Sequence, residues 1–249
     1  MTRRRILITG ASSGLGAGMA RAFAARGRDL ALCARRVDNL EQLRAELVTA
    51  HPGITVAVRR LDVNDHAAVP TVFAELRDEL GGLDRVIVNA GLGKGVPVGT
   101  GRADANIATA TTNFVAGLAQ AEAALEIFRK QDSGHLVLIS SMSAVRGLPG
   151  KKTAYAASKA GMTALGEGLA TELRRSPIAV TTLQPGFIAT EMVARAGDGA
   201  LVVPLEKGVG AMVAAIERET VRACVPQWPW RALNLVFPLL PRAIIARMG

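Results

Sequence analysis

The chain has 249 residues, enough for one sizeable hydrophobic core, and we expect residues 1–249 to form a single domain. Hydrophobic residues make up 49% and charged residues 20%, a balance typical of soluble globular proteins. The formal net charge is +9, and the basic groups at Arg3–Arg5 and Arg35–Arg36 have no interleaved aromatics. We therefore expect no nucleic-acid binding; an acidic ligand or an anionic membrane surface fits this charge better.

Two cysteines, Cys33 and Cys224, lie far apart in the chain and lack the spacing of metal ligands. We expect neither a disulfide framework nor a bound metal, which fits a reducing cytoplasm. The first apolar run begins at Ile6, so no signal peptide fits before it, and no run reaches the length of a membrane span.

Short apolar runs alternate with longer helical patterns along the chain. The predicted strands are 5–9, 30–34, 55–61, 85–88, 135–140, 179–184 and 222–225. The predicted helices are 14–26, 40–50, 67–80, 105–130, 154–175 and 205–218. This alternation predicts a doubly wound α/β fold, in which a seven-stranded parallel sheet is flanked by helices. We expect residues 195–204 to form a flexible loop, because Gly197 and Gly199 interrupt the helical pattern there.

A glycine-rich turn follows the first predicted strand. It consists of Gly10, Ala11, Ser12, Ser13, Gly14, Leu15 and Gly16, with the spacing Gly-x-x-x-Gly-x-Gly. Glycines there permit a tight turn and close approach of a pyrophosphate, and the next helix presents free N–H groups to the phosphates. Because the turn joins a strand to a helix in a βαβ pattern, it predicts a dinucleotide site.

The end of the second predicted strand indicates which dinucleotide binds. An acidic residue is expected there for NAD(H), about 20 residues beyond the glycines, but this chain has Ala34 followed by Arg35 and Arg36. A guanidinium can bind a 2′-phosphate with charge-assisted hydrogen bonds. The sequence therefore favours NADP(H), with NAD(H) as the alternative cofactor.

A tyrosine and a lysine stand four positions apart, at Tyr155 and Lys159, on one face of a predicted helix. Tyr155 is the only tyrosine of the chain, and the preceding predicted strand ends beside Ser141. A nearby ammonium favours the phenolate and is expected to lower the pKa of the phenol.

The glycine turn and the Tyr-x-x-x-Lys pair with its upstream serine resemble the short-chain dehydrogenase/reductase family, which has a Rossmann-type fold. The resemblance implies that Tyr155 is the general acid or base and that Lys159 tunes it and binds the nicotinamide ribose. It implies that Ser141 donates a hydrogen bond to the substrate oxygen, and that Asn113 holds a water in a proton relay. The stretch from Ser141 to Tyr155 is one position longer than is usual, so Ser140 and Ser143 compete for the serine role. We prefer Ser141 because it lies just past the strand end.

Further segments in the same order match the family's cofactor contacts. The resemblance implies adenine contacts from Asp62 and Val63, a structural segment at Asn89, Ala90 and Gly91, and nicotinamide contacts from Pro185, Gly186, Ile188 and Thr190. The similarity covers roughly residues 5–192 and implies an enzyme that interconverts a carbonyl and a secondary alcohol, in a homodimer or homotetramer.

The segments expected to face the substrate, 94–97, 142–148 and 192–204, are mostly aliphatic or small, which favours a hydrophobic or lipid-like substrate. Residues 227–249 combine both tryptophans, aliphatic residues and arginines, and Pro238 and Pro241 forbid one uninterrupted helix. This segment is expected to pack on a partner subunit, cover the active site, or touch the inner face of a membrane. Two other functions are weighed: a nucleotide-sensing protein without catalysis, and a membrane-associated lipid-binding protein.

Overall fold

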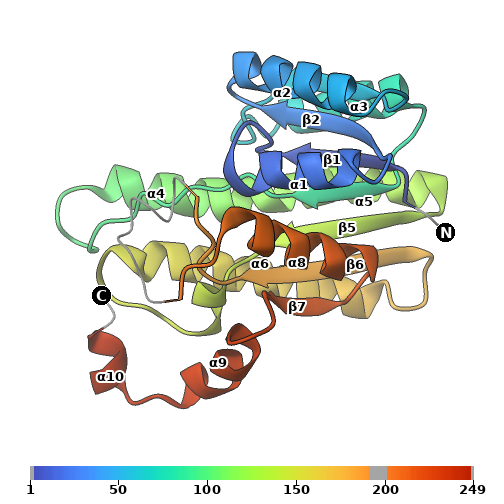
Figure 1. Ribbon diagram of the computed structural model, residues 1–249. Helices are drawn as coiled ribbons and strands as arrows, with labels where there is room; N and C mark the ends of the chain where they lie inside the picture. The colour runs from blue at the N-terminus through green and yellow to red at the C-terminus, as the bar shows by residue number, and fades with distance from the viewer. Residues whose placement is uncertain (1–2, 191–200, 248–249) are drawn as a thin grey trace.

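A computed structural model describes residues 3–190 and 201–247 of the chain. Its centre is a sheet of seven parallel strands in the order β3-β2-β1-β4-β5-β6-β7 (Figure 1). The strands are β1 (Arg5–Thr9), β2 (Asp29–Ala34), β3 (Val56–Arg60), β4 (Arg85–Val88), β5 (Gly134–Ile139), β6 (Ile178–Pro185) and β7 (Arg222–Val225). All seven predicted strands are confirmed, and no end differs from its prediction by more than one residue.

Helices cover both faces of the sheet. On one face the core is formed with α1 (Gly14–Ala24), α2 (Val37–Ala50) and α8 (Leu205–Glu217). On the other face it is formed with α3 (Ala68–Leu80), α5 (Ala116–Gln131) and α6 (Thr153–Glu172). Successive strand residues serve opposite cores, as Ile6 and Ile8 do for the first and Leu7 for the second. The strands are therefore apolar throughout, and the predicted doubly wound fold is confirmed.

The prediction of one continuous helix over 105–130 is wrong. The chain instead forms α4 (Ala103–Ala110), a π-helical turn η1 (Thr111–Val115) and then α5. A π turn inserts one extra residue into the helical repeat and occurs often at functional sites. Asn113, one of the predicted site residues, lies in the middle of this turn.

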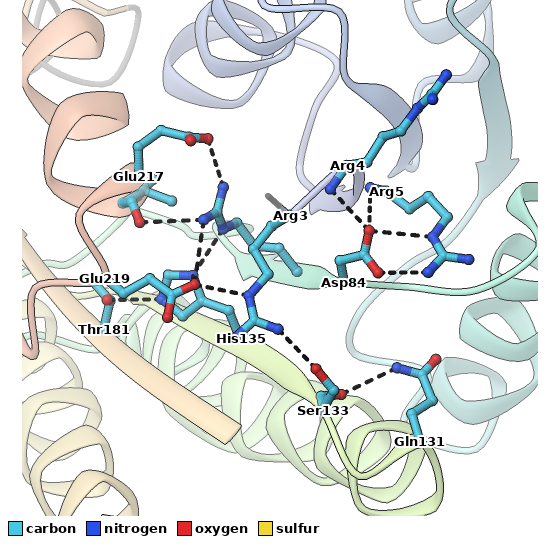
Figure 2. A network of polar contacts seen from close by, with 12 residues as sticks. Arg3, Arg4, Arg5, Asp84, Gln131, Ser133, His135, Thr181, Glu217 and Glu219 are labelled. Carbon is cyan, nitrogen blue, oxygen red and sulfur yellow. Dashed lines mark hydrogen bonds and ion pairs between the residues drawn. The ribbon is translucent and has the colours of Figure 1, made fainter. Parts of the chain in front are cut away.

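The N-terminal arginines are bound in ion pairs at the edge of the sheet where the strands begin (Figure 2). Arg3, Arg4 and Arg5 pair with Glu219, Asp29 and Asp84 at N···O distances of 2.8, 2.8 and 2.7 Å. These three cations therefore join the start of β1 to the first residue of β2 and to the segments before β4 and β7, rather than forming a free basic patch.

Beside these pairs, a buried arginine and a buried histidine connect three strands to the end of α8. Arg85 Nε donates to His135 Nδ1 at 2.8 Å, and Arg85 Nη1 donates to Glu217 Oε1 at 2.8 Å. His135 Nε2 lies 2.8 Å from the hydroxyl oxygen of Thr181. Because Nδ1 accepts a hydrogen bond, the ring is neutral and carries its proton on Nε2.

Beyond β7 the chain forms a separate C-terminal segment along the lower edge in Figure 1. It comprises α9 (Trp230–Val236), a 3-10 turn η4 (Phe237–Leu239) and α10 (Arg242–Ala246). The predicted interruption is confirmed, since Pro238 lies in η4 and Pro241 precedes α10. Over the described ranges 3–190 and 201–247, no helix is both long enough and apolar enough to cross a bilayer.

The predicted flexible loop at 195–204 falls largely outside the described residues, as does most of the predicted substrate segment 192–204. Where the description resumes, Val203 forms an isolated parallel bridge with Ile188. Val203 N donates to Phe187 O at 3.0 Å, and Ala189 N donates to Val203 O at 2.9 Å.

Candidate active site

A cavity of about 700 Å³ opens at the carboxyl ends of the strands. It lies where the strand order reverses between β1 and β4, the place where doubly wound sheets bind ligands. The structure brings every predicted cofactor-binding residue to its lining, together with Ser141, Tyr155 and Lys159. Asn113 is the one predicted site residue that does not line it.

The glycine turn is shaped for close backbone approach. Gly10 and Gly14 have φ angles of 63° and 54°, which favour glycine over other residues. A Cβ on Gly10 would lie 2.8 Å from Ala90 Cα, and a Cβ on Gly16 would lie 2.9 Å from Ala11 Cα. Glycines at these positions therefore let the turn pack closely on itself and on the 89–91 segment, while its backbone lines the cavity and is open to an anionic ligand such as a pyrophosphate.

The segment after β4 is tied to the end of β1. Asn89 N and Ala90 N donate to Thr9 Oγ1 at 3.0 and 3.1 Å, and Asn89 Nδ2 donates to Thr9 O at 2.8 Å. These bonds hold the floor of the cavity beneath the glycine turn.

At the end of the cavity beside β2, Arg36 reaches the glycine turn. Arg36 Nη2 donates to Ser13 Oγ at 2.6 Å and to Ser12 Oγ at 3.2 Å. Arg35 is also exposed and lines the cavity. Two guanidinium groups and two hydroxyls therefore gather where an acidic residue would stand in an NAD(H) site. Asp62 also lines the cavity, two residues beyond the end of β3.

At the other end, α6 presents Tyr155 and Lys159 beside Ser141, which directly precedes the 3-10 turn η2 (Met142–Val145). The hydroxyl of Ser141 accepts a hydrogen bond from Ser143 N at 3.1 Å and forms a hydrogen bond with Tyr155. Lys159 Nζ donates to the carbonyl oxygen of Ile139 at 2.8 Å.

Of the competing serines, Ser140 is engaged in helix packing. Its hydroxyl donates to Lys159 O at 2.8 Å and lies 2.7 Å from Thr163 Oγ1. The geometry therefore favours Ser141 over Ser140 as the hydroxyl available to a substrate.

Burial controls the ionisation of the tyrosine and the lysine. Burial raises the pKa of the Tyr155 phenol, and the hydrogen bond with Ser141 acts in the opposite direction. Burial lowers the pKa of the Lys159 ammonium from 10.5 to about 8. The sequence predicts that Lys159 lowers the pKa of Tyr155, but in this arrangement the lowering contribution comes from Ser141, because Lys159 Nζ is directed at Ile139.

Asn113 stands behind the cavity wall and braces it. Its Oδ1 accepts from Leu92 N at 2.7 Å, and its Nδ2 donates to Leu92 O at 2.9 Å and to Ser158 Oγ at 3.1 Å. A Cβ built on Gly91 would lie 3.2 Å from Asn113 Oδ1 and 3.6 Å from Lys159 Nζ. Gly91 thus leaves a small space between the amide and the ammonium.

Pro185, Gly186, Ile188 and Thr190, at and beyond the end of β6, also line the cavity. Gly186 N donates to Val225 O at 3.0 Å. A Cβ on Gly186 would overlap the indole ring of Trp230, which is 2% exposed. Trp230 is therefore a support of this wall that the sequence motifs do not reveal, since it belongs to the C-terminal segment.

Several further lining residues lie on or just before α4, on η1 and on the loops after β3 and β4. They are Asn64, Leu92, Gly93, Lys94, Arg102, Asp104, Ala105, Ala108 and Thr112. Lys94 alone fell within a segment expected to face the substrate. No motif marks the others, because the fold brings them to the cavity.

Comparison with known proteins agrees with this geometry. The family model described as short chain dehydrogenase matches residues 4–200. An uncharacterized oxidoreductase of Mycobacterium tuberculosis is 59% identical over 249 residues, which are 100% of this chain and 98% of the relative. Dehydrogenase/reductase SDR family member 11 of Homo sapiens is 35% identical over 201 residues, covering 78% of this chain and 77% of the relative.

Two solved structures share the fold at similar length. Levodione reductase superposes with a TM-score of 0.83 at 27% identity, covering 93% of this chain and 99% of that structure. NADPH-dependent 3-quinuclidinone reductase from Rhodotorula rubra has a TM-score of 0.78 at 27% identity, with 89% of each chain covered.

Together the sheet, the glycine turn and the cavity define a nucleotide-binding α/β oxidoreductase of Rossmann type. The chain belongs to the short-chain dehydrogenase/reductase family, whose members act on CH–OH groups with NAD(P) as acceptor.

Proposed function

We propose that the protein is an NADP(H)-dependent oxidoreductase that interconverts a hydrophobic, lipid-like carbonyl compound and its secondary alcohol. The observation that carries this proposal is the shared cavity, with Arg35 and Arg36 at one end and Ser141, Tyr155 and Lys159 at the other. The relative named as an NADPH-dependent reductase supports the choice of cofactor.

The residues fit such a cofactor. The glycine turn and the N-terminus of α1 would hold the pyrophosphate, Asp62 and Val63 the adenine, and Arg35 and Arg36 the 2′-phosphate. Lys159 would bind the nicotinamide ribose, while Pro185, Gly186, Ile188 and Thr190 would contact the nicotinamide. When bound, the cofactor supplies the hydride in reduction and accepts it in oxidation.

In reduction, the Tyr155 hydroxyl gives its proton to the oxygen of the former carbonyl, and the Ser141 hydroxyl donates a hydrogen bond to the same oxygen. In oxidation, Tyr155 takes that proton back. Lys159 is protonated at neutral pH, since its pKa is about 8, and can resupply the proton. A water in the space beside Gly91, between Asn113 Oδ1 and Lys159 Nζ, would continue the relay.

The substrate class rests on the walls of the catalytic end. Leu92, Ile139 and Ile188 line the cavity there. An apolar ketone or secondary alcohol buries its carbon skeleton against such walls at less desolvation cost than a sugar. We also infer that residues 1–249 form one domain, and that copies assemble as a homodimer or homotetramer in the cytoplasm.

Titration of the purified protein with NADPH and NADH tests the cofactor preference. We expect tighter binding of NADPH in the wild type, and a loss of about tenfold or more in Arg36→Ala, because hydrogen bonds to charged groups contribute about 1.5–3 kcal/mol. Arg35→Ala should also remove much of the preference, and Ala34→Asp should shift it toward NADH. Equal dissociation constants for the two cofactors in the wild type would contradict the proposal.

A screen of apolar ketones and secondary alcohols tests the substrate class, with absorbance of the reduced cofactor as readout. We expect turnover to improve as the carbon skeleton lengthens. A clear preference for polyhydroxylated substrates would overturn the assignment while leaving the cofactor proposal intact.

A further inference from the structure

The outer surface of the C-terminal segment is apolar where a surface helix should be polar. Along α9 and into η4, the residues Trp230, Leu233, Asn234 and Phe237 recur at helical spacing and are buried or half-buried. The opposite face carries Leu235 and Val236, which α9 leaves exposed. A helix packed on a protein normally pairs an inward apolar stripe with a polar outer face. The outer face of α9 differs, because it exposes Leu235 and Val236 beside Arg231.

Exposed apolar residues continue beyond α9 on both sides. The exposed fractions are 79% for Trp228, 70% for Leu235, 48% for Val236, 82% for Leu239 and 46% for Ile244. We call these five residues, with the exposed Arg231, Arg242 and Arg247 among them, the C-terminal patch. Large exposed apolar residues concentrated in one terminal segment point to a surface that contacts a partner or a membrane.

The charge of the segment has one sign. After Glu219 the sequence contains Arg222, Arg231, Arg242 and Arg247 and no aspartate or glutamate. A two-fold pairing of this patch with a second copy would bring the arginines of both copies together without compensating carboxylates. An anionic surface, in contrast, would be attracted by the same charges.

The patch is held in place by the body of the protein. Arg146 Nη1 donates to Phe237 O at 3.1 Å and to Pro238 O at 2.7 Å. The rings of Phe187 and Trp230 meet edge to face with centroids 5.3 Å apart. Trp230 also packs with Met142, the residue after Ser141. The patch is therefore presented by an ordered element that is joined to the walls of the active site.

We propose that the C-terminal patch docks the protein on an anionic lipid bilayer. Tryptophan and leucine side chains enter the interfacial region, and the arginines contact the lipid phosphates. Docking in this way is independent of the reductase activity, and it would bring the catalytic end of the cavity close to apolar compounds dissolved in the bilayer.

Sedimentation with vesicles tests this proposal on the full chain. We expect the wild type to bind vesicles of phosphatidylcholine with phosphatidylglycerol, to bind phosphatidylcholine alone much more weakly, and to be released by high salt. Leu235→Ser with Leu239→Ser should weaken binding at least about tenfold, because burying one leucine contributes about 1.5–3 kcal/mol. Arg231→Gln with Arg242→Gln should weaken binding to the anionic vesicles about tenfold or more, at about 1 kcal/mol per arginine.

Val48→Ser is the matched control, since Val48 is 43% exposed on α2, far from the patch in Figure 1. It should bind vesicles as the wild type does, and circular dichroism should show that all variants are folded. Failure of the wild type to bind anionic vesicles would overturn the proposal, as would binding that the patch variants leave unchanged. A change in oligomer mass in the leucine variant on sizing chromatography would instead assign the patch to a second copy and also overturn it.

Discussion

At the residue scale, the two neighbouring serines after β5 differ in what their hydroxyls contact. Ser140 Oγ is bonded to Lys159 O and Thr163 Oγ1, whereas Ser141 Oγ accepts from Ser143 N and bonds with Tyr155. The difference follows from the strand end, where successive residues point in opposite directions. Ser140 therefore supports α6, and Ser141 faces the reacting end of the cavity.

We expect Ser141→Ala to lower kcat by about 10²–10³-fold, as loss of an oxyanion-type donor does. Ser140→Ala should keep most of the activity and lower the free energy of unfolding by about 1 kcal/mol, the usual contribution of one hydrogen bond. Steady-state kinetics and urea unfolding of both variants separate the two roles. A reversed outcome, in which Ser140→Ala is the inactive variant, would show that Ser140 is the catalytic hydroxyl.

At the element scale, the close packing of α9 on the end of β6 supports the cavity wall formed by Pro185 and Gly186. Gly186 leaves no room for a Cβ beside the indole of Trp230, so an added methyl must displace α9 or the wall. Gly210 in α8 has no atom within 4 Å of the position a Cβ would take and gives a matched control.

We expect Gly186→Ala to lower the free energy of unfolding by about 1–3 kcal/mol, the usual effect of overpacking, and to raise KM for the cofactor. Gly210→Ala should be neutral or stabilise the protein by about 0.5–1 kcal/mol, because alanine is favoured over glycine within a helix. Thermal unfolding and steady-state kinetics measure both effects. If Gly186→Ala and Gly210→Ala had equal free energies of unfolding, α9 would accommodate the added methyl group without loss of stability, contrary to this expectation.

The elements also show how far the sequence could be used to predict this protein. Alternating apolar runs predict all seven strands, because each buried strand must be apolar on both faces. The motifs single out residues that the fold brings to one cavity, while their roles toward cofactor and substrate remain predictions. The π turn around Asn113 was not predicted, because it depends on bonds to Leu92 and Ser158 from other elements. The support by Trp230 was not predicted either, because a residue of the terminal segment meets Gly186 only after folding.

At the scale of the whole molecule, the end of the sheet opposite the cavity contains the buried pair of Arg85 and His135. His135 is labelled in Figure 2, beside Glu219 and Thr181. Burial lowers the pKa of His135 well below its usual 6.5, and the charges of Arg85 and Arg3 lower it further. At pH values between that lowered pKa and 6.5, the His135 side chain is protonated in the unfolded chain but neutral in the folded chain.

The free energy of unfolding should therefore fall as the pH falls below about 6.5, and this contribution should be fully present above that pH. Urea unfolding at about pH 7.5 and about pH 5.5 measures the change, because these two pH values lie on either side of the ordinary histidine pKa of about 6.5. His135→Asn keeps an acceptor for Arg85 but does not titrate, so it should show a smaller loss between the two pH values. An equal loss in both proteins would mean that His135 does not carry the effect.

The central claim for the whole molecule has two parts: the cavity binds NADP(H), and Tyr155 transfers the proton in the reaction that uses this cofactor. Comparison of the wild type with Tyr155→Phe in the reduction of an apolar ketone by NADPH tests it most directly, with the NADPH dissociation constant measured on the same samples. The account predicts a fall in kcat of about 10²–10⁴-fold, the range for general acid catalysis, with little change in NADPH binding. If Tyr155→Phe kept more than about a tenth of the wild-type kcat, far above what that range allows, Tyr155 would not be the proton donor.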